Sequence, residues 1–188
     1  MICARLNHVE LEFETAPRLF SPLHPDRGTM ALLSTITFEA EDKVLDLGCG
    51  YGLVGIYAAK LIGGSRVWMS DNDPLALEFA RRNLVRNGVL EANVVLSDGF
   101  HDLKEADFTN IIFNPPYHAD FSLPKHFIEK GFNRLVIGGE MHLVTKRKTW
   151  YANKLTNIFG GCKVRAIDSY FVLQATKKSH SYARALTR

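Results

Sequence analysis

The sequence predicts an α/β fold: a doubly wound, Rossmann-like domain whose mostly parallel sheet is covered by helices on both faces. From about residue 43, strand-like and helix-like segments alternate at the spacing of βαβ units. A glycine-rich turn, residues 46–52, separates the first strand-like segment from the first helical one, as in nucleotide-binding domains. An acidic residue, Asp71, ends the second strand-like segment. These observations predict a ligand site beyond the carboxyl ends of parallel strands.

The segment before this core is expected to contribute one strand and one helix. Residues 9–13 alternate apolar and acidic side chains, which predicts a half-buried strand. Residues 20–29 contain two prolines and predict a loop, which leads into a helix at residues 30–35. We therefore expect residues 1–42 to pack a strand and a first helix against the core.

Within the core, glycines mark where the helices stop. Asp73 followed by Pro74 marks a helix start, because aspartate caps free N–H groups and proline suits the first helical position. The last two strands flank Asp168 and Ser169 and predict a terminal hairpin. The expected strands are 43–47, 66–70, 93–96, 110–113, 140–145, 163–167 and 170–176, and the expected helices are 53–62, 74–88, 123–135 and 150–159.

Length and composition indicate a single globular domain, residues 1–176. The 188 residues are 46% apolar, and no apolar run is long enough to span a bilayer. The first residues lack the hydrophobic core of a signal peptide, so export is not expected. Cys3, Cys49 and Cys162 form no paired pattern, which favours a reducing compartment and argues against a structural metal. We expect a cytoplasmic protein that neither binds a metal nor enters a membrane.

The basic residues are concentrated at the C-terminus. The net charge is +3, and residues 177–188 carry four basic residues and no acidic one. Without those four, 19 basic residues stand against 20 acidic ones. Non-specific nucleic-acid binding depends on many phosphate contacts, so any contact with a polyanion must be local. The tail also has few apolar side chains, and we expect it to be mobile.

The glycine-rich turn matches the spacing of a nucleotide-binding loop. Gly50, Gly52 and Gly55 give the pattern GxGxxG between a strand and a helix. Glycines permit a close approach of the backbone, and the helix N-terminus attracts an anion. Asp71, 21 residues after Gly50, stands where an acid binds ribose hydroxyls. These features alone fit a nicotinamide cofactor and S-adenosylmethionine (SAM) equally well.

Two further acids favour SAM. Asp46 lies at the mouth of the loop, where a negative charge disfavours a pyrophosphate but suits the ammonium group of SAM. Asp98 follows the third core strand and could accept a hydrogen bond from the adenine amine. An ordinary strand-end cap is the alternative for Asp98.

The sequence Asn114-Pro115-Pro116-Tyr117 follows the fourth core strand. Each proline fixes φ and removes a backbone donor, and Asn114 is held extended because it precedes a proline. The Asn114 amide oxygen and the Pro115 carbonyl could accept both hydrogens of an exocyclic –NH₂ group. Tyr117 offers a flat face for stacking. The alternative is that the prolines merely terminate a strand.

Taken in order, the glycine loop, Asp71, Asp98 and the Asn-Pro-Pro-Tyr turn resemble the class I SAM-dependent methyltransferases over about residues 9–177. A narrower resemblance is to the 16S ribosomal RNA guanine-N2 methyltransferases. It is carried by Phe20-Ser21-Pro22, Asp26-Arg27-Gly28-Thr29, Ser97-Asp98-Gly99-Phe100, Asn114-Pro115-Pro116-Tyr117-His118 and Gly138-Gly139-Glu140.

The resemblance implies a seven-stranded sheet with an antiparallel last strand, SAM as methyl donor, and ribosomal RNA as partner. It also implies that Thr29 meets the cofactor's carboxylate, for which a helix N-cap is the alternative. The expected cofactor-binding residues are Thr29, Asp46, Gly48, Cys49, Gly50, Gly52, Asp71, Asn72, Asp98, Gly99 and Asn114. The expected catalytic residues are Asn114, Pro115 and Tyr117, and the expected substrate-binding residues are Pro116, Tyr117, His118, Lys146 and Arg147.

The chain departs from the guanine-N2 family in two respects. Family members often carry a second, degenerate N-terminal half, whereas this sequence contains only the catalytic half. The family usually has phenylalanine where Tyr117 stands, and tyrosine there resembles adenine-N6 and glutamine-N5 methyltransferases. Both acceptors therefore stay open as alternatives to guanine.

The expected chemistry needs alignment more than acid–base catalysis. A sulfonium methyl group is already activated, and the amine loses its proton easily once it has taken the methyl group. Cys49 is thus expected to be a small loop residue and not a nucleophile. His118 and the run Lys146-Arg147-Lys148 could contact phosphate, or could simply be exposed to solvent. A Rossmann dehydrogenase and an inactive RNA-binding module are the rival functions, and neither gives the Asn114 turn a task.

Overall fold

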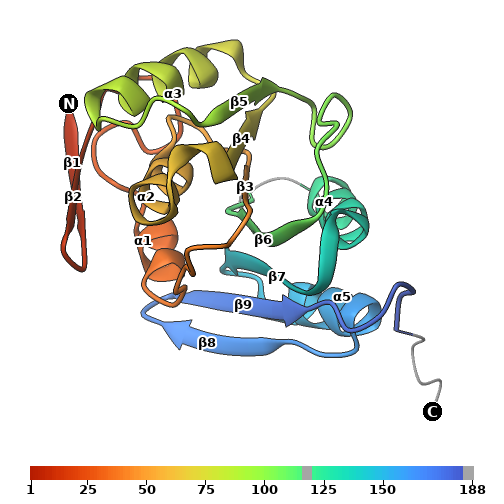
Figure 1. Cartoon of the computed structure of the whole chain (residues 1–188). Helices are drawn as coiled ribbons and strands as arrows, with labels where there is room; N and C mark the ends of the chain where they lie inside the picture. The colour runs from red at the N-terminus through yellow and green to blue at the C-terminus, as the bar shows by residue number, and fades with distance from the viewer. Residues whose placement is uncertain (116–119, 184–188) are drawn as a thin grey trace.

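A computed structural model describes residues 1–115 and 120–183 of the chain. Its centre is a seven-stranded sheet in the order β5-β4-β3-β6-β7-β9-β8 (Figure 1). Neighbouring strands from β5 to β7 are parallel, whereas β9 pairs antiparallel with both β7 and β8. The strands are β3 (Val44–Leu47), β4 (Val67–Asp71), β5 (Asn93–Leu96), β6 (Phe108–Phe113), β7 (Leu135–Thr145), β8 (Lys163–Ile167) and β9 (Tyr170–Thr176). The predicted fold class is confirmed.

Helices cover both faces of the sheet and divide the core into two parts. One face packs against α1 (Arg27–Leu33), α2 (Leu53–Ile62) and α3 (Pro74–Arg86), and the other against α4 (Ser122–Arg134) and α5 (Lys148–Phe159). A short 3₁₀ helix, Gly64–Arg66, joins α2 to β4. Successive residues of β3 serve opposite faces, because side chains alternate along a strand: Val44 packs in the first core and Leu45 in the second. Neither Val44 nor Leu45 has any exposed surface.

A separate two-stranded hairpin, β1 (Ile2–Leu6) and β2 (Val9–Phe13), packs against α2 and α3. Asn83 of α3 fixes it in place: its side chain accepts from the Glu14 backbone N–H at 2.7 Å and donates to the Glu14 carbonyl at 3.0 Å. The same amide donates to the Tyr51 carbonyl at 2.9 Å. The hairpin is therefore connected through one buried side chain to the glycine-rich loop.

The strand order reverses between β3 and β6, and this determines where a ligand can bind. Chain connections lead outward in one direction from β3 through β4 to β5, and in the other from β6 to β7. The loops after β3 and β6 therefore diverge and leave a crevice beyond the carboxyl ends of these strands. The glycine-rich loop and Asn114 follow β3 and β6 respectively, so both lie at this crevice.

Most element boundaries agree with the sequence prediction to within two residues. Strand β1 was not predicted, although Ile2, Ala4 and Leu6 alternate with exposed residues. Helix α1 begins at Arg27 and not at residue 30, because Asp26 and not Thr29 is its N-cap. Strand β7 begins five residues before the expected start, directly after α4, and pairs irregularly with the start of β6.

The first residues of the predicted basic tail, 177–188, pack against the domain. Lys177 is buried, and its ammonium group donates to the Leu135 carbonyl at 2.6 Å. The Tyr182 ring packs edge-on against Phe132, and the Ala183 N–H donates to the Ile158 carbonyl at 2.9 Å. Residues 177–183 are thus attached to the domain, which corrects the expectation of a mobile tail for this stretch. Residues 184–188 lie outside the described part of the chain.

Among residues 1–115 and 120–183, no helix combines the length and apolar character required to cross a bilayer.

Candidate active site

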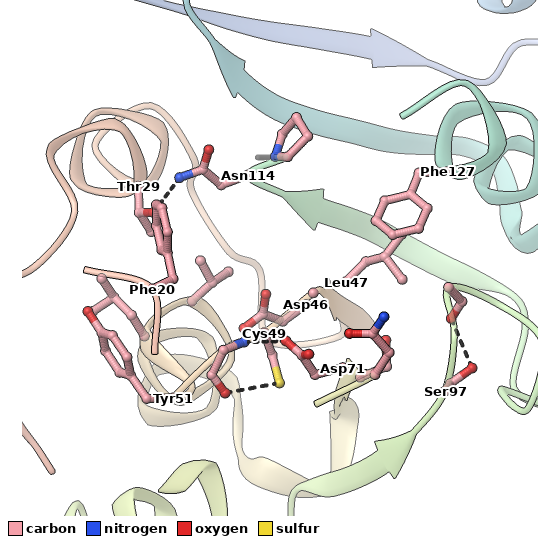
Figure 2. A pocket seen from close by; sticks show the side chains of 18 of the residues that line it. Phe20, Thr29, Asp46, Leu47, Cys49, Tyr51, Asp71, Ser97, Asn114 and Phe127 are labelled. Atoms are coloured by element: carbon pink, nitrogen blue, oxygen red, sulfur yellow. Dashed lines mark hydrogen bonds between the residues drawn. The ribbon is translucent and has the colours of Figure 1, made fainter. Parts of the chain in front are cut away.

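The crevice at the carboxyl ends of the strands holds a cavity of about 270 Å³ (Figure 2). Its polar lining comes from strand ends and loops, and its apolar lining from both helical layers. The polar or glycine residues are Asp26, Thr29, Asp46, Gly48, Cys49, Gly50, Ser70, Asp71, Asn72, Ser97, Asp98, Gly99 and Asn114, and the others are Phe20, Leu47, Tyr51, Leu53, Val54, Pro115, Leu123 and Phe127. Ten of the eleven predicted cofactor residues therefore line one cavity. The exception is Gly52, which does not line the cavity.

The glycine loop forms one wall, and its conformation requires glycine. Gly48, Gly50 and Gly52 have φ of +74°, +55° and +100°, values that residues with a side chain rarely adopt. No atom lies within 4 Å of the point where a Cβ would stand on Gly48 or Gly50, so these positions leave open space for a ligand. A Cβ on Gly52 would instead lie 2.7 Å from Met69 Cε. Gly52 is the N-cap of α2 and fits between the loop and β4.

Asp46 lies at the bottom of this wall and is only 3% exposed. Its Oδ2 accepts a hydrogen bond of 2.8 Å from the Gly55 N–H, in the first turn of α2. Burial raises the pKa of Asp46 to about 7, and the nearby Asp71 carboxylate adds to the rise, while the Gly55 hydrogen bond opposes it. A carboxylate so poorly solvated is a strong potential partner for a ligand cation.

Asp71 ends β4 and shapes the loop from the opposite side. Its Oδ2 accepts from the Gly50 N–H at 2.8 Å, and its Oδ1 accepts from the Asp73 N–H at 2.9 Å. A carboxylate has about four acceptor sites, so each oxygen can still bind a hydroxyl of a ligand. Asn72 and Asp98 are exposed at the rim, and Gly99 is buried beside them. Asp71, Asn72, Asp98 and Gly99 all line the cavity.

Asn114 stands across the cavity from the glycine loop, directly after β6. Its Nδ2 donates to Asp26 Oδ2 and to Thr29 Oγ1, both at 2.9 Å, as Figure 2 shows for Thr29. Its Oδ1 is buried and accepts no hydrogen bond from the described residues. Leaving a buried acceptor unpaired costs about 1–3 kcal/mol, which a ligand donor would remove.

A second unpaired oxygen belongs to another residue that lines this cavity. Ser70 is 1% exposed, and its Oγ has no hydrogen-bond partner among the described residues. In the described part of the chain, Ser70 and Asn114 are the two residues with such an unsatisfied buried side-chain atom, and both line this cavity. Because buried polar atoms are normally satisfied, their coincidence here indicates a site built to hold a polar ligand.

Cys49 lines the cavity but is not suited to act as a nucleophile. The residue is 7% exposed, and its Sγ lies 3.6 Å from the Gly50 carbonyl oxygen. Burial, together with the carboxylates of Asp46 and Asp71, raises the pKa of the thiol well above its usual value. The reactive thiolate is therefore scarce at neutral pH.

The remaining predicted site residues lie elsewhere. Pro116, Tyr117 and His118 fall outside the described residues. Lys146 and Arg147 follow β7 at the same edge of the sheet, but they do not line the cavity. They are exposed, and each cation lies over an aromatic ring: Lys146 Nζ is 5.1 Å from the centre of Tyr170, and Arg147 Cζ is 5.2 Å from that of Phe121.

Several lining residues were not predicted as site residues from the sequence. Asp26 is the most important, because it contacts Asn114 across a gap of 88 positions in the chain. Its place in a Pro-Asp sequence before a helix was a capping signal, but nothing local indicates which loop it faces. Phe20, Leu47 and Phe127 supply apolar surface and appear in the sequence as ordinary core candidates.

Among known protein families, residues 10–174 match the one described as "Methyltransferase small domain". The chain belongs to this methyltransferase family. The predicted resemblance to methyltransferases is thereby confirmed, and the rival Rossmann dehydrogenase is not supported.

Curated ribosomal RNA methyltransferases resemble the chain over most of its length. A ribosomal RNA small subunit methyltransferase C of Haemophilus influenzae is 35% identical over 171 residues, which cover 89% of this chain and 51% of that protein. A ribosomal RNA large subunit methyltransferase G of Alteromonas mediterranea is 34% identical over 164 residues, covering 81% of this chain and 40% of that protein. The chain thus spans about half the length of the curated relatives it matches.

Solved structures agree with the assigned fold. A 16S rRNA N2 methyltransferase of T. thermophilus, in complex with AdoMet (SAM) and guanosine, superposes with a TM-score of 0.78 at 28% identity. The match covers 94% of this chain and 50% of that one. A methyltransferase from Pyrococcus furiosus gives a TM-score of 0.71 at 21% identity, with 90% of both chains covered, and so supports the fold alone.

Proposed function

We propose that this protein transfers the methyl group of SAM to the exocyclic N2 of guanine in small-subunit ribosomal RNA. The observation that carries the proposal is the Asn114 amide oxygen, a buried acceptor without a partner among the described residues, on a side chain that lines a glycine-walled cavity at the switch point of the sheet. Family membership supports methyl transfer, and the relatives named above support ribosomal RNA as the substrate.

The residues present suit SAM better than a dinucleotide. Asp46 and Asp71 give the loop two carboxylates, which would repel a pyrophosphate but bind the ammonium and ribose hydroxyls of SAM. The open space over Gly48 and Gly50 would admit the methionine portion, and Asp98 with Gly99 would border the adenine. When bound, SAM supplies an activated methyl group on a sulfonium. The AdoMet complex of the T. thermophilus neighbour supports the same cofactor.

The protein's own contribution is to hold the acceptor amine. Asn114 Oδ1 accepts one hydrogen of the amine, and we propose that the Pro115 carbonyl accepts the other. These two contacts direct the nitrogen lone pair toward the methyl group for in-line displacement. No histidine is among the described lining residues, and the Cys49 thiol is not ionised at neutral pH. No general base is required, because the methylated nitrogen loses its proton readily to water.

The acceptor is inferred to be guanine on two grounds. The neighbour that superposes with a TM-score of 0.78 carries guanosine beside AdoMet, and the relatives include small-subunit methyltransferases. Lys146 and Arg147, at the same edge of the sheet, would contact phosphates of an RNA. We propose that Tyr117 stacks on the base, as the sequence predicts.

The test is to incubate the protein with radiolabelled SAM and ribosomal RNA or small subunits, and to identify the labelled nucleoside. We expect N2-methylguanosine. Label in N6-methyladenosine would move the acceptor to adenine, and label only in protein would move it to glutamine. Calorimetry gives an independent check of the cofactor: S-adenosylhomocysteine (SAH) should bind, whereas NAD should not. Binding of NAD alone would overturn the methylation proposal.

Replacing Asn114 tests the central contact. Asn114→Ala should lower the rate of methyl transfer by about two orders of magnitude, because the amine loses its aligned acceptor. The affinity for SAH should change much less. Ser34→Ala, which removes a polar side chain at the C-cap of α1 outside the cavity, serves as control and should retain full activity. A folded Asn114→Ala protein with unchanged rate would refute this role.

A further inference from the structure

Turning the Asn114 amide by 180° would exchange its oxygen and its nitrogen, and only the oxygen can accept a hydrogen bond from an amine. We propose that Asp26 is a positioning residue, which fixes the Asn114 amide with Oδ1 toward the acceptor amine. The proposal rests on the proposed function and extends it to a residue in the segment before the core.

The contacts of Asn114 permit only one orientation of its amide. A carboxylate accepts hydrogen bonds and donates none, so the atom 2.9 Å from Asp26 Oδ2 must be the amide nitrogen. The Thr29 hydroxyl donates its single hydrogen to Asp26 Oδ2 at 3.1 Å. The Thr29 oxygen can then only accept a hydrogen bond from Asn114, at 2.9 Å. The amide atom that faces it must therefore also be the nitrogen.

Turning the amide over would reverse the chemistry of the site. The amide oxygen would face two acceptors, and both hydrogen bonds would be lost. The NH₂ group would then take the place of Oδ1, and its hydrogens would oppose those of an incoming amine. The charged acceptor thus selects an amine-binding state over a carbonyl-binding one. It also polarises the amide, which makes Oδ1 a better acceptor.

Asp26 is itself held firmly enough for this task. It is the N-cap of α1, and its Oδ2 accepts from the Thr29 N–H at 2.7 Å. One carboxylate oxygen therefore serves the helix end, the Thr29 hydroxyl and the Asn114 amide together. The position of the amide is consequently tied to the start of α1.

Asp26→Ser separates the positioning role from the capping role. Serine also caps helices well, but its shorter side chain does not reach Asn114. We expect kcat to fall about tenfold or more while the affinity for SAH stays within about threefold. The matched control is Asp73→Ser. Asp73 caps α3 by accepting from the Leu75 N–H at 2.9 Å and does not line the cavity, so activity should be retained.

A double-mutant cycle shows whether Asp26 acts through Asn114. If it does, Asp26→Ser costs activity only while Asn114 is present, and the double variant should be as active as Asn114→Ala alone. Independent, multiplying losses would overturn the proposal. The cycle can be run with whichever amine the parent protein methylates, so its result does not depend on guanine being the acceptor.

A spectroscopic measurement tests the contact without any activity. The side-chain NH₂ resonances of Asn114 can be assigned in the ¹H–¹⁵N spectrum by their loss in Asn114→Ala. They should shift in Asp26→Ser and stay in place in Asp73→Ser. Unmoved resonances in Asp26→Ser would overturn the positioning role even if methyl transfer occurs. Shifted resonances in a protein that methylates nothing would uphold the contact and refute the proposed function.

Discussion

At the scale of single residues, Asp46 is a carboxyl group whose ionised form is destabilised by burial in the cavity wall. Burial raises its pKa to about 7, from an ordinary value of 3.8. Near neutral pH its proton is therefore easily lost or gained. A cation placed beside it would favour the ionised form and make the carboxyl release its proton.

This gives the affinity for SAH a defined pH dependence. The ligand's ammonium should bind the ionised carboxylate, so the affinity of the parent protein should rise between pH 6 and pH 8. Calorimetry in buffers of different ionisation enthalpy should detect proton release on binding near pH 6.5. In Asp46→Asn the affinity should be weaker, and the pH dependence over this range should disappear. An affinity that falls as pH rises would contradict the assignment of Asp46 to the ammonium.

Asp46 also affects the stability of the ligand-free protein. The folded state binds the Asp46 proton more tightly than the unfolded state, so stability is lost as pH rises from about 4 to about 7. Asp46→Asn removes this loss and keeps an acceptor for the Gly55 N–H. We expect its free energy of unfolding at pH 8 to exceed that of the parent by about 1–3 kcal/mol. Denaturant titrations should show the difference shrinking toward pH 4, and a less stable variant at pH 8 would contradict the account.

At the scale of elements, the close contact of α2 with β4 sets the geometry of the glycine loop. Gly55 lies in the first turn of α2, and a Cβ there would stand 2.4 Å from Met69 Cγ and 3.3 Å from Asp46 Oδ2. The helix can start this close to the strand because Gly55 has no side chain. Its N–H then reaches Asp46 within hydrogen-bond distance.

Gly55→Ala should therefore destabilise the protein, although alanine favours helices. The clash lies near the base of the Met69 side chain and cannot be relieved by its flexible end, so we expect a loss of about 1–3 kcal/mol and weaker SAH binding. Gly131→Ala in α4 is the matched control, because its Cβ would clash with the terminal Met141 Cε, at 2.5 Å, and would make ordinary contacts of 3.5 and 3.6 Å with Phe100 and Ile111. Thermal unfolding should show a clearly smaller effect for Gly131→Ala. Equal losses in both would show that the fit of α2 against β4 is not special.

At the scale of the whole molecule, basic side chains lie at the edge of the sheet that holds the cavity and at the opposite edge. On α3, Arg82 and Arg86 form ion pairs with glutamates. Lys146 and Arg147 are exposed beyond the end of β7, at the edge of the sheet where the cavity lies. Lys60 is exposed on the last turn of α2, at the opposite edge. The two edges can therefore be compared by removing one positive charge at a time.

Lys146→Ala and Arg147→Ala should each weaken RNA binding several-fold at moderate salt and reduce the dependence of log K on log salt concentration by about one. The affinity for SAH should not change. Lys60→Ala makes the same change in net charge and should leave RNA binding nearly intact. Filter-binding titrations over a range of salt concentrations would measure this. An equal loss with Lys60→Ala would show that the whole surface, and not this edge, attracts RNA.

The sequence by itself determined the fold class, most of the elements and eleven of the residues that line the cavity, ten predicted to bind the cofactor and Pro115. These follow from local signals: strand periodicity, helix caps, and glycines whose positive φ the loop requires. An acid at a strand end can be placed from the sequence, because parallel strands bring their carboxyl ends to one edge.

Only the tertiary structure decided how these residues act on one another. The hydrogen bonds from Asn114 to Asp26 and Thr29, the pKa of Asp46 and the packing of residues 177–183 all depend on groups distant in the chain. Local sequence carries a residue's conformational preference but not the identity of its partner across the molecule. The direction of the Asn114 amide is set by such a partner, a carboxylate that can accept a hydrogen bond and cannot donate one.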